Sequence, residues 1–186
     1  MVIGKAPAAK TVDCDLQREF KEVMACVATP VSVVTAMAGP DVPSGATVSA
    51  FTSLSIDPPM VMVALDHRSR TLDAIRACGA FGLNVLGAEQ ADVALSFAAK
   101  GGADKFHGAA WGIDRGLPRI DRAPAWIAST VADLVDGGDH VIVLGRVRAA
   151  EVTDSQPPLV YHRRSFGTHL PDRVPPLLAP APTRSG

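Results

Sequence analysis

Short runs of apolar residues recur along this chain, most of them rich in β-branched side chains, and turn residues separate them. Runs of this kind predict strands. Turn signals stand at Gly39-Pro40-Asp41 and at Asp136-Gly137-Gly138, and the second joins two long runs as an antiparallel pair. The predicted strands span residues 31–38, 46–54, 60–66, 80–86, 125–135, 140–152 and 157–163.

Three other stretches repeat their apolar residues at helical spacing. Asp15 caps a predicted helix through about Ala25, whose apolar face holds Leu16, Phe20, Val23 and Met24. Further helices are predicted over Thr71–Cys78, ended by Gly79, and over residues 88–99, which carry Val93, Leu95 and Phe97. Strands and helices do not alternate regularly, so the pattern favours a mainly β fold, an antiparallel barrel with flanking helices, over a parallel sheet.

The length of 186 residues and the hydrophobic content of 47% fit one folded domain, which we place at residues 13–170. Residues 1–12 and the Pro-rich residues 171–186 are expected to be flexible tails. The net charge of -1 argues against nucleic-acid partners. No apolar run reaches the roughly 20 residues of a membrane helix, and the first residues lack the apolar core of a signal peptide. A cytoplasmic protein is therefore expected.

Several kinds of catalytic site lack a signal in the sequence. The five histidines show no metal-ligand spacing, and the cysteines, Cys14, Cys26 and Cys78, are far apart, so we expect no metal and read the cysteines as reduced, buried or incidental thiols. The G-x-S-x-G pattern of hydrolases, the Walker loop and the G-x-G-x-x-G pattern are also missing.

The segment HRSRT, residues 67–71, has the composition of a phosphate site. Ser69 and Thr71 stand where a helix begins, with Arg68 and Arg70 between and beside them. Free N–H groups of a helix N-terminus, hydroxyls and guanidinium groups all suit a phosphate. The alternative, which the segment alone favours, is an ordinary serine cap with solvated arginines.

Two further segments leave two interpretations open. The small residues of GATVSAF, residues 45–51, either let a flat ligand lie against the backbone or let a helix or subunit pack closely. His140 is the first residue of a predicted strand that follows a Gly-Gly turn, and it either contacts a ligand near the start of that strand or is simply solvated.

Taken together and in order, these elements resemble the flavin reductase family with an FMN-binding split barrel, the NAD(P)H:flavin oxidoreductases that serve two-component monooxygenases. The similarity runs from about Phe20 to Gly167. The segments that carry it are VSVVTA, GATVSAFTSLSIDPPMVMVAL, RSRT, FGLNVL, ADKFHGAAW, GGDHVIVLGRV and PPLVYHRRSFG. The resemblance implies a six-stranded antiparallel Greek-key split β-barrel with flanking helices, and a homodimer with the flavin near the subunit interface.

The resemblance also implies which residues form the site. His140 and Tyr161 would face the nicotinamide nucleotide, and His140 is the one residue expected to act in catalysis. The residues expected to bind the flavin are Ser44, Gly45, Ala46, Thr47, Ser49, Ala50, Ala64, Leu65, Asp66, Ser69, Arg70, Thr71, Ser96, Phe97, Lys105 and Phe106.

The expected reaction is hydride transfer from NADH or NADPH to FMN or FAD, with the reduced flavin supplied to a partner monooxygenase. The cofactor carries this chemistry, so no nucleophile or strong base is needed. No arginine cluster is placed for a 2′-phosphate, which favours NADH, while the choice between FMN and FAD stays open. The competing readings are a non-catalytic flavin- or haem-binding split-barrel protein and a scaffold that has lost its ligand.

Overall fold

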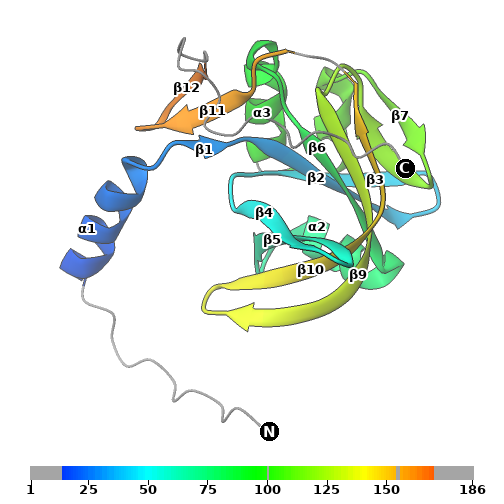
Figure 1. Ribbon diagram of the computed structural model, residues 1–186, viewed down its shortest axis with the longest axis horizontal. Coiled ribbons are helices and arrows are strands. Elements are labelled where there is room, and N and C mark those ends of the chain that lie inside the picture. The colour runs from blue at the N-terminus through cyan, green and yellow to red at the C-terminus, as the bar shows by residue number, and fades with distance from the viewer. Residues whose placement is uncertain (1–13, 100, 154–155, 170–186) are drawn as a thin grey trace, which may run out of the picture.

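The computed structural model describes residues 14–99, 101–153 and 156–169. The two expected tails lie outside these residues, and the domain limits at 13 and 170 stay a prediction. Seven strands form one antiparallel sheet in the order β3-β2-β6-β9-β10-β5-β4 (Figure 1). Their bounds are β2 (Ser32–Gly39), β3 (Val42–Val48), β4 (Phe51–Ile56), β5 (Pro59–Asp66), β6 (Ala80–Val85), β9 (Ala125–Gly137) and β10 (His140–Val152).

The sheet closes where its two end strands meet in the sequence. Strands β3 and β4 are consecutive in the chain, and only Ser49 and Ala50 lie between them. At this junction the N–H of Ala64 in β5 donates to the carbonyl of Ala50 at 2.9 Å. The mainly β barrel with flanking helices is confirmed, but the six-strand count is not, because the stretch predicted as one strand at 46–54 is divided here.

Two smaller sheets complete the β structure. One is the three-stranded sheet β1-β11-β12, and the other is the β7-β8 hairpin, which the sequence pattern did not reveal. The bounds are β1 (Thr29–Pro30), β7 (Trp111–Asp114), β8 (Leu117–Ile120), β11 (Leu159–His162) and β12 (Ser165–Thr168). The predicted last strand at 157–163 is therefore β11, and it lies outside the main sheet.

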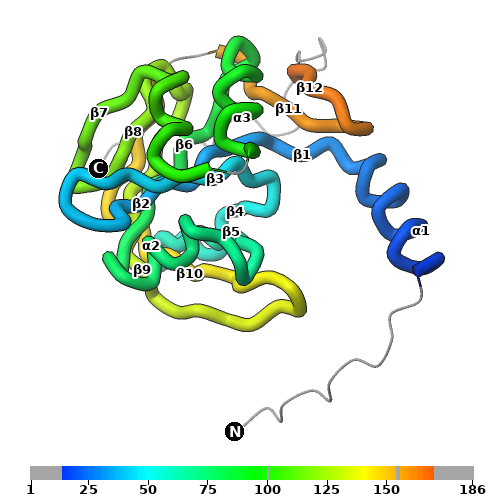
Figure 2. Tube along the Cα trace, turned by 180° about the vertical axis from the view of Figure 1, so that it is seen from behind, coloured from blue at the N-terminus to red at the C-terminus, as the bar shows by residue number. Residues whose placement is uncertain are grey.

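The helices are α1 (Cys14–Ala25), α2 (Arg70–Cys78) and α3 (Ala91–Ala98), with 3-10 turns η1 (Ala88–Gln90) and η2 (Ala103–Gly108). Helices α2 and α3 cover the two faces of the sheet, whereas α1 projects from it (Figure 2). Neighbouring residues of β2 point to opposite faces of the sheet. Val34 joins the cluster that α2 covers with Leu72 and Ile75, and Val33 joins the cluster that α3 covers with Phe97. Strand β2 is thus buried on both faces and anchors the fold.

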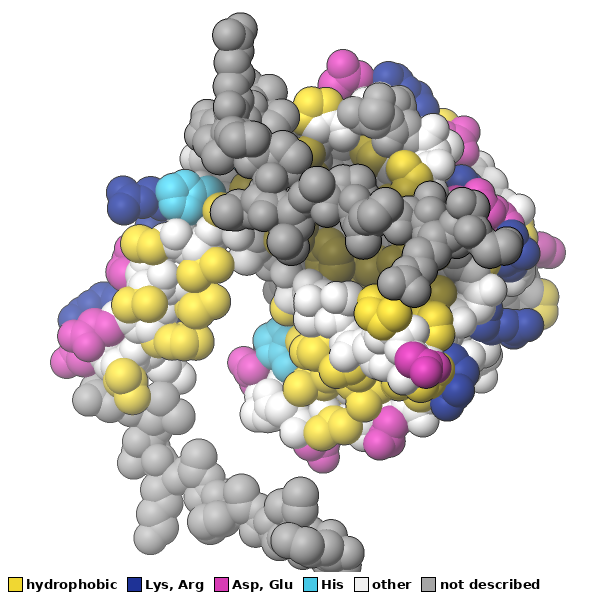
Figure 3. Space-filling view, in the orientation of Figure 1, with side chains coloured by type: hydrophobic (Ala, Val, Ile, Leu, Met, Phe, Trp, Pro, Cys, Tyr) yellow, Lys and Arg dark blue, Asp and Glu magenta, His cyan; other side chains and the backbone are white. Residues whose placement is uncertain are grey.

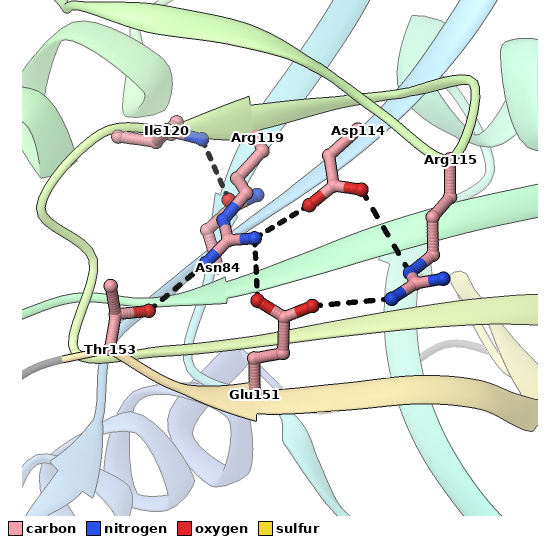
Figure 4. Close-up of polar contacts among 7 residues, drawn as sticks. All are labelled: Asn84, Asp114, Arg115, Arg119, Ile120, Glu151 and Thr153. Carbon is pink, nitrogen blue, oxygen red and sulfur yellow. Dashed lines mark hydrogen bonds and ion pairs between the residues drawn. The ribbon is translucent and has the colours of Figure 1, made fainter.

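A polar network fastens the β7-β8 hairpin to the main sheet (Figure 4). The buried Asn84 of β6 accepts from the N–H of Ile120 at 2.8 Å and donates to the carbonyl of Val33 at 3.1 Å. At the surface of the same hairpin, Arg119 donates to Asp114 and to Glu151. The side chain of Asn84 therefore provides hydrogen-bond partners for buried backbone groups of two neighbouring segments.

Replacing Asn84 with leucine should lower the free energy of unfolding by about 2–4 kcal/mol. Leucine has a similar shape, but it leaves the buried N–H of Ile120 without its acceptor and the hydroxyl of Thr35 without a donor. Urea unfolding monitored by circular dichroism measures the change, and the exposed Ser53→Ala serves as a control expected within about 0.5 kcal/mol of the parent. A loss below about 1 kcal/mol for Asn84→Leu would contradict the role given to this side chain.

Helix α1 projects from the body of the molecule (Figures 1 and 2). Its end is held by a hydrogen bond from the N–H of Arg163 to the carbonyl of Ala25 and by an ion pair between Arg164 and Glu22. None of its residues is buried. The helix predicted from the sequence is present, but it begins at Cys14, so Asp15 lies in its first turn and is not its cap. Its apolar face covers nothing within the described part of this chain.

Candidate functional site

Two adjoining cavities open where β3, β5 and the start of α2 meet. Their volumes are about 550 and 290 Å³, and they share Ala46, Asp66 and Ser69. The larger is lined by Ser44, Gly45, Ala46, Asp66, Arg68, Ser69, Arg70, Thr71, Ala98, Gly101 and Lys105. The smaller is lined by Ala46, Thr47, Val48, Ser49, Ala50, Ala64, Leu65, Asp66, Ser69 and His140.

Strand β3 presents its edge to these cavities. Consecutive residues from 44 to 50 line them, whereas one face of a strand would contribute alternate residues. Among the strands that the structure describes, β3 pairs only with β2. The N–H and C=O groups on its other edge are therefore placed to bond the polar rim of a flat ligand.

The small side chains of β3 also let helix α3 approach closely. The hydroxyl of Thr47 donates to the carbonyl of Ala94 at 2.7 Å. A Cβ atom added at Gly45 would lie 2.7 Å from Cε1 of Phe97, which is closer than carbon atoms pack. The close packing of a helix against the small-residue stretch is therefore confirmed. The backbone edge of the stretch faces the cavities, and a flat ligand at this edge stays a prediction.

The start of α2 supplies hydroxyls and main-chain N–H groups to the larger cavity. Ser69 is the N-cap, and its Oγ accepts from the N–H of Leu72 at 3.4 Å. The hydroxyls of Thr71 and Ser44 are hydrogen-bonded to each other at 3.1 Å, which ties the helix to β3. The first N–H groups of a helix have no partner within the helix, so this end suits an anion.

Two cations at this cavity lack a carboxylate partner. Lys105 donates through Nζ to the carbonyls of Gly45 and Phe97 at 3.3 and 3.0 Å. Burial, and then the nearby Arg70, lower the pKa of Lys105. Neither Lys105 nor Arg70 forms an ion pair with any residue that the structure describes. Their charges are therefore available to an anionic ligand.

Arg68 differs because Asp66 neutralises it. Its guanidinium donates to both carboxylate oxygens of Asp66, at 3.1 and 2.8 Å. These hydrogen bonds, together with one from the Arg68 backbone N–H, hold the pKa of Asp66 well below its usual range. The Arg68–Asp66 ion pair therefore lines the cavity without adding a net positive charge to it.

His140 stands at the open side of the smaller cavity. It is the register partner of Asp66 across the β10-β5 pairing. Its Nδ1 lies 2.7 Å from Oδ1 of Asp139, and this hydrogen bond lowers the pKa of the Asp139 carboxyl. The bond fixes the plane of the imidazole ring and leaves Nε2 as the ring nitrogen available to a ligand.

Most of the residues expected at the site line these two cavities, but four do not. Phe97 and Phe106 are 1% and 2% exposed and pack edge to face in the core behind Gly45. Ser96 donates to the carbonyl of Lys105, and Tyr161 lies on β11 against Phe166. The structure does not bring these four side chains to the cavity walls. Ser96, Phe97 and Phe106 lie next to the cavity-lining residues, Tyr161 lines neither cavity, and the ligand contacts expected of these four residues stay a prediction.

The cavity walls also include residues that were not expected from the sequence. Val48 and Ala98 have no chemical signal of their own, and Gly101 lies in a glycine pair whose approach to Arg70 only the fold reveals. Within the described ranges, no group of three or more His, Cys, Asp and Glu residues is arranged to hold a metal ion. No helix of those ranges has the length and apolarity to cross a membrane.

Known proteins are similar to this chain in sequence and in fold. The family model described as flavin reductase like domain matches residues 24–169. The reductase component of a 4-nitrophenol 4-monooxygenase/4-nitrocatechol 2-monooxygenase from Rhodococcus opacus is 42% identical over 83% of this chain and 82% of its own. A probable flavin reductase from Rhizobium meliloti (strain 1021) is 38% identical over 72% of this chain, but this match spans only 43% of that protein.

A solved structure agrees with these matches. The NADH:FAD oxidoreductase of Streptomyces globisporus, in complex with NAD and FAD fragments, superposes with a TM-score of 0.80 at 30% identity and covers 89% of this chain and all of its own. The matched region runs from the end of α1 through β12 and so contains both cavities. The resemblance read from the sequence is confirmed, and the chain belongs to the flavin reductase family.

Proposed function

We propose that this protein is an NADH-dependent flavin reductase that transfers hydride from NADH to FMN or FAD and supplies reduced flavin to a partner monooxygenase. The observation that carries the proposal is the junction of the two cavities. Both cavities meet the backbone edge of β3 that pairs with no other described strand, and the larger also offers a helix N-terminus with Arg70 and Lys105, which form no ion pair with a described residue. A flavin nucleotide has the matching parts, a flat ring with a polar rim and a phosphorylated side chain.

The residues present fit the flavin, and each has a distinct task. The N–H groups along β3 would hold the ring and stabilise the negative charge that reduction places on it. Ser69, Arg70, Thr71 and Lys105 would bind the phosphate end. When bound, the flavin accepts the hydride, so the protein contributes orientation and electrostatics rather than a reacting side chain.

His140 is proposed to contact the nicotinamide nucleotide. Its ring lines the smaller cavity on the side that is open, where a second flat ring can stack on the first. Asp139 keeps the ring in place through the 2.7 Å hydrogen bond. A fixed imidazole nitrogen can then hold the nicotinamide nucleotide while its C4 faces the flavin.

Replacing His140 with alanine is expected to raise KM for NADH about tenfold while kcat changes less, because a ligand hydrogen bond worth about 1.4 kcal/mol is lost. Steady-state kinetics with varied NADH at saturating flavin measure both constants. The matched control is His67→Ala, since His67 is an exposed histidine nearby that lines neither cavity. Equal effects of the two variants would remove His140 from the nucleotide site.

The proposed function is tested by mixing the purified protein with FMN, FAD or riboflavin and with NADH or NADPH. Loss of the nicotinamide absorbance that depends on added flavin supports a reductase. Bound flavin without oxidation of NADH favours the non-catalytic flavin-binding protein. If the protein neither binds flavin nor oxidises NADH, the scaffold hypothesis remains. The same experiment determines the preferred flavin and nucleotide.

The quaternary state and the location also belong to the proposal. We expect a homodimer, which the uncovered apolar face of α1 supports. The partner monooxygenase would receive reduced flavin by diffusion or by contact. A cytoplasmic location remains a prediction, and Cys14, Cys26 and Cys78, which are free and exposed rather than buried, are compatible with it.

A further inference from the structure

A third cavity lies where the β7-β8 hairpin meets strands β6, β9 and β10. Its volume is about 280 Å³, and its walls are formed by Ala80, Arg115, Leu117, Ala128, Ser129 and Arg148. None of these residues lines either of the two cavities described above. The third cavity is therefore a separate part of the surface, and the proposed flavin reduction does not use it.

The floor of the third cavity is apolar. Leu117 and Ala128 belong to one buried cluster, and Ala80 packs against that cluster. Ser129 pairs with Phe81, which lies in the core cluster under α2, so the Ser129 side chain points toward that core and its backbone meets the cavity. A ligand in this cavity would therefore rest on aliphatic side chains.

Two guanidinium groups stand at the rim of the same cavity. Arg115 donates through Nη2 to Oε1 of Glu151 at 3.3 Å (Figure 4), whereas Arg148 forms no ion pair and no side-chain hydrogen bond with any described residue. The carboxylates of Asp114 and Glu151 also bond Arg119. Figure 3 shows basic and acidic side chains interleaved on the flank of the molecule where Figure 1 places the hairpin. Three guanidinium groups therefore share two carboxylates, which leaves one positive charge without a partner among the described residues.

A β-bulge brings Arg148 to this side of the sheet together with Glu151. Val147 and Ala149 pair with consecutive residues of β9, so Arg148 between them is the extra residue of the bulge. In a regular strand Arg148 and Glu151, three positions apart, would point to opposite faces. The bulge shifts the alternation, and both side chains reach the face that the β7-β8 hairpin covers. Bulges of this kind are common where a protein has to aim a functional side chain.

The hairpin turn holds Arg115 in a backbone conformation that an arginine rarely adopts. Its φ is 51°, and Gly116 follows with a φ of 78°. Two-residue turns with positive φ at both positions favour Asn, Asp or Gly at the first of them, so the turn alone does not account for an arginine. Its long side chain reaches Glu151 and the cavity rim, and its Nη1 has no partner among the described residues. Arg115 can therefore keep its bond to Glu151 and still donate to a ligand.

We propose that the third cavity binds a small organic carboxylate, whose oxygens accept from Arg148 and Arg115 and whose apolar part lies on Ala80 and Leu117. A guanidinium group matches a carboxylate through two parallel N–H···O bonds. The volume equals the share of about nine water molecules in the liquid, which fits a ligand with about nine non-hydrogen atoms, the size of benzoate. Inorganic phosphate would reach the charged rim and leave the apolar floor in water, so the organic anion is the better match.

The test is isothermal titration of the full chain with benzoate, in the presence of FMN at saturating concentration so that the flavin cavities are filled. Benzoate should bind with a dissociation constant on the order of 1 mM or tighter. Benzyl alcohol, which has the same ring without the charge, should bind at least about tenfold more weakly. Inorganic phosphate, which has the charge without the ring, should also bind at least about tenfold more weakly.

Three variants assign the binding to this cavity. Arg148→Gln should weaken benzoate binding at least about tenfold, because it removes the charged donor. Arg146→Gln is the matched control and should stay within about twofold, since Arg146 is an exposed arginine of the same strand that lines none of the three cavities. Ala80→Leu fills the floor without changing the charge and should also weaken binding at least about tenfold. Circular dichroism checks folding, and Ala80→Val replaces Ala80→Leu if that variant fails to fold.

Several results would overturn the carboxylate site. They are no binding of benzoate by the parent, equal effects of Arg148→Gln and Arg146→Gln, unchanged binding by the variant with a filled floor, and phosphate binding as tight as that of benzoate. The site does not depend on flavin reduction. A protein that binds benzoate through Arg148 but reduces no flavin would count against the proposed function alone, and a flavin reductase that binds no benzoate would count against the third cavity alone.

Discussion

Gly45→Val is expected to abolish flavin binding and to lower the free energy of unfolding by about 1–3 kcal/mol. Any side chain at this position meets the ring of Phe97 at 2.7–2.8 Å and that of Phe106 at 3.2 Å. Both rings are buried and in mutual contact, so they cannot move aside. Strand β3 must shift instead, and its shift displaces the backbone groups that face the cavities. Fluorescence titration with FMN and FAD and urea unfolding measure the two effects.

Gly39→Val is the matched control, since it inserts the same side chain into an open position of β2. Nothing lies within 4 Å of a Cβ built at Gly39. The control should bind flavin as the parent does. If Gly45→Val also binds flavin with parental affinity, β3 does not form the floor of the flavin site.

The double substitution Arg70→Ala with Lys105→Met is expected to raise the dissociation constants of FMN and FAD about 100- to 1,000-fold. In the proposed site each cation would contribute a charged hydrogen bond to the phosphate end, worth roughly 1.5–3 kcal/mol. Riboflavin, which has no phosphate, should bind to parent and variant alike within about twofold. Isothermal titration with all three ligands separates the loss of phosphate contacts from damage to the ring site.

Arg76→Ala controls for the loss of a positive charge on the same helix, because Arg76 faces away toward Asp73. The parent should also lose affinity for FMN as pH rises, and the loss should begin below 10.5, the ordinary lysine value. The pKa of Lys105 is lowered, so its ammonium group loses its proton earlier than an exposed lysine does. Arg70→Ala with Lys105→Met should lack this dependence, and equal weakening of riboflavin and FMN would remove both cations from the phosphate site.

The order of strands and helices could be read from the sequence because most elements have regular patterns and marked turns. The break at Ser49 and Ala50 could not, since the alternation of side chains continues through it. It depends on the long-range hydrogen bond from Ala64. The β7-β8 hairpin was missed because its strands are four residues each and contain Gly112 and Pro118, residues that rarely mark a strand.

The helix start at the larger cavity could be predicted from local chemistry, although the segment alone favoured an ordinary serine cap and its phosphate role stays a prediction. Ser69 and Arg70 are adjacent to a helix start, and that position itself predicts an anion site. The burial of Phe97 and Phe106 could not be predicted, because sequence spacing does not tell which side of a neighbouring strand an aromatic ring occupies. The structure decides this through the packing of both rings behind Gly45.

The long hairpin of β9 and β10 sets a limit on how related sequences can vary in length. It holds His140 at one end and, at the other, Glu151, which bonds Arg119. Adding or removing one residue in β10 between them would turn one of these side chains to the opposite side of the sheet, unless a new bulge absorbed it. Relatives with the same site are therefore expected to place insertions at the Arg115-Gly116 turn of β7-β8 and to keep the hairpin length unchanged.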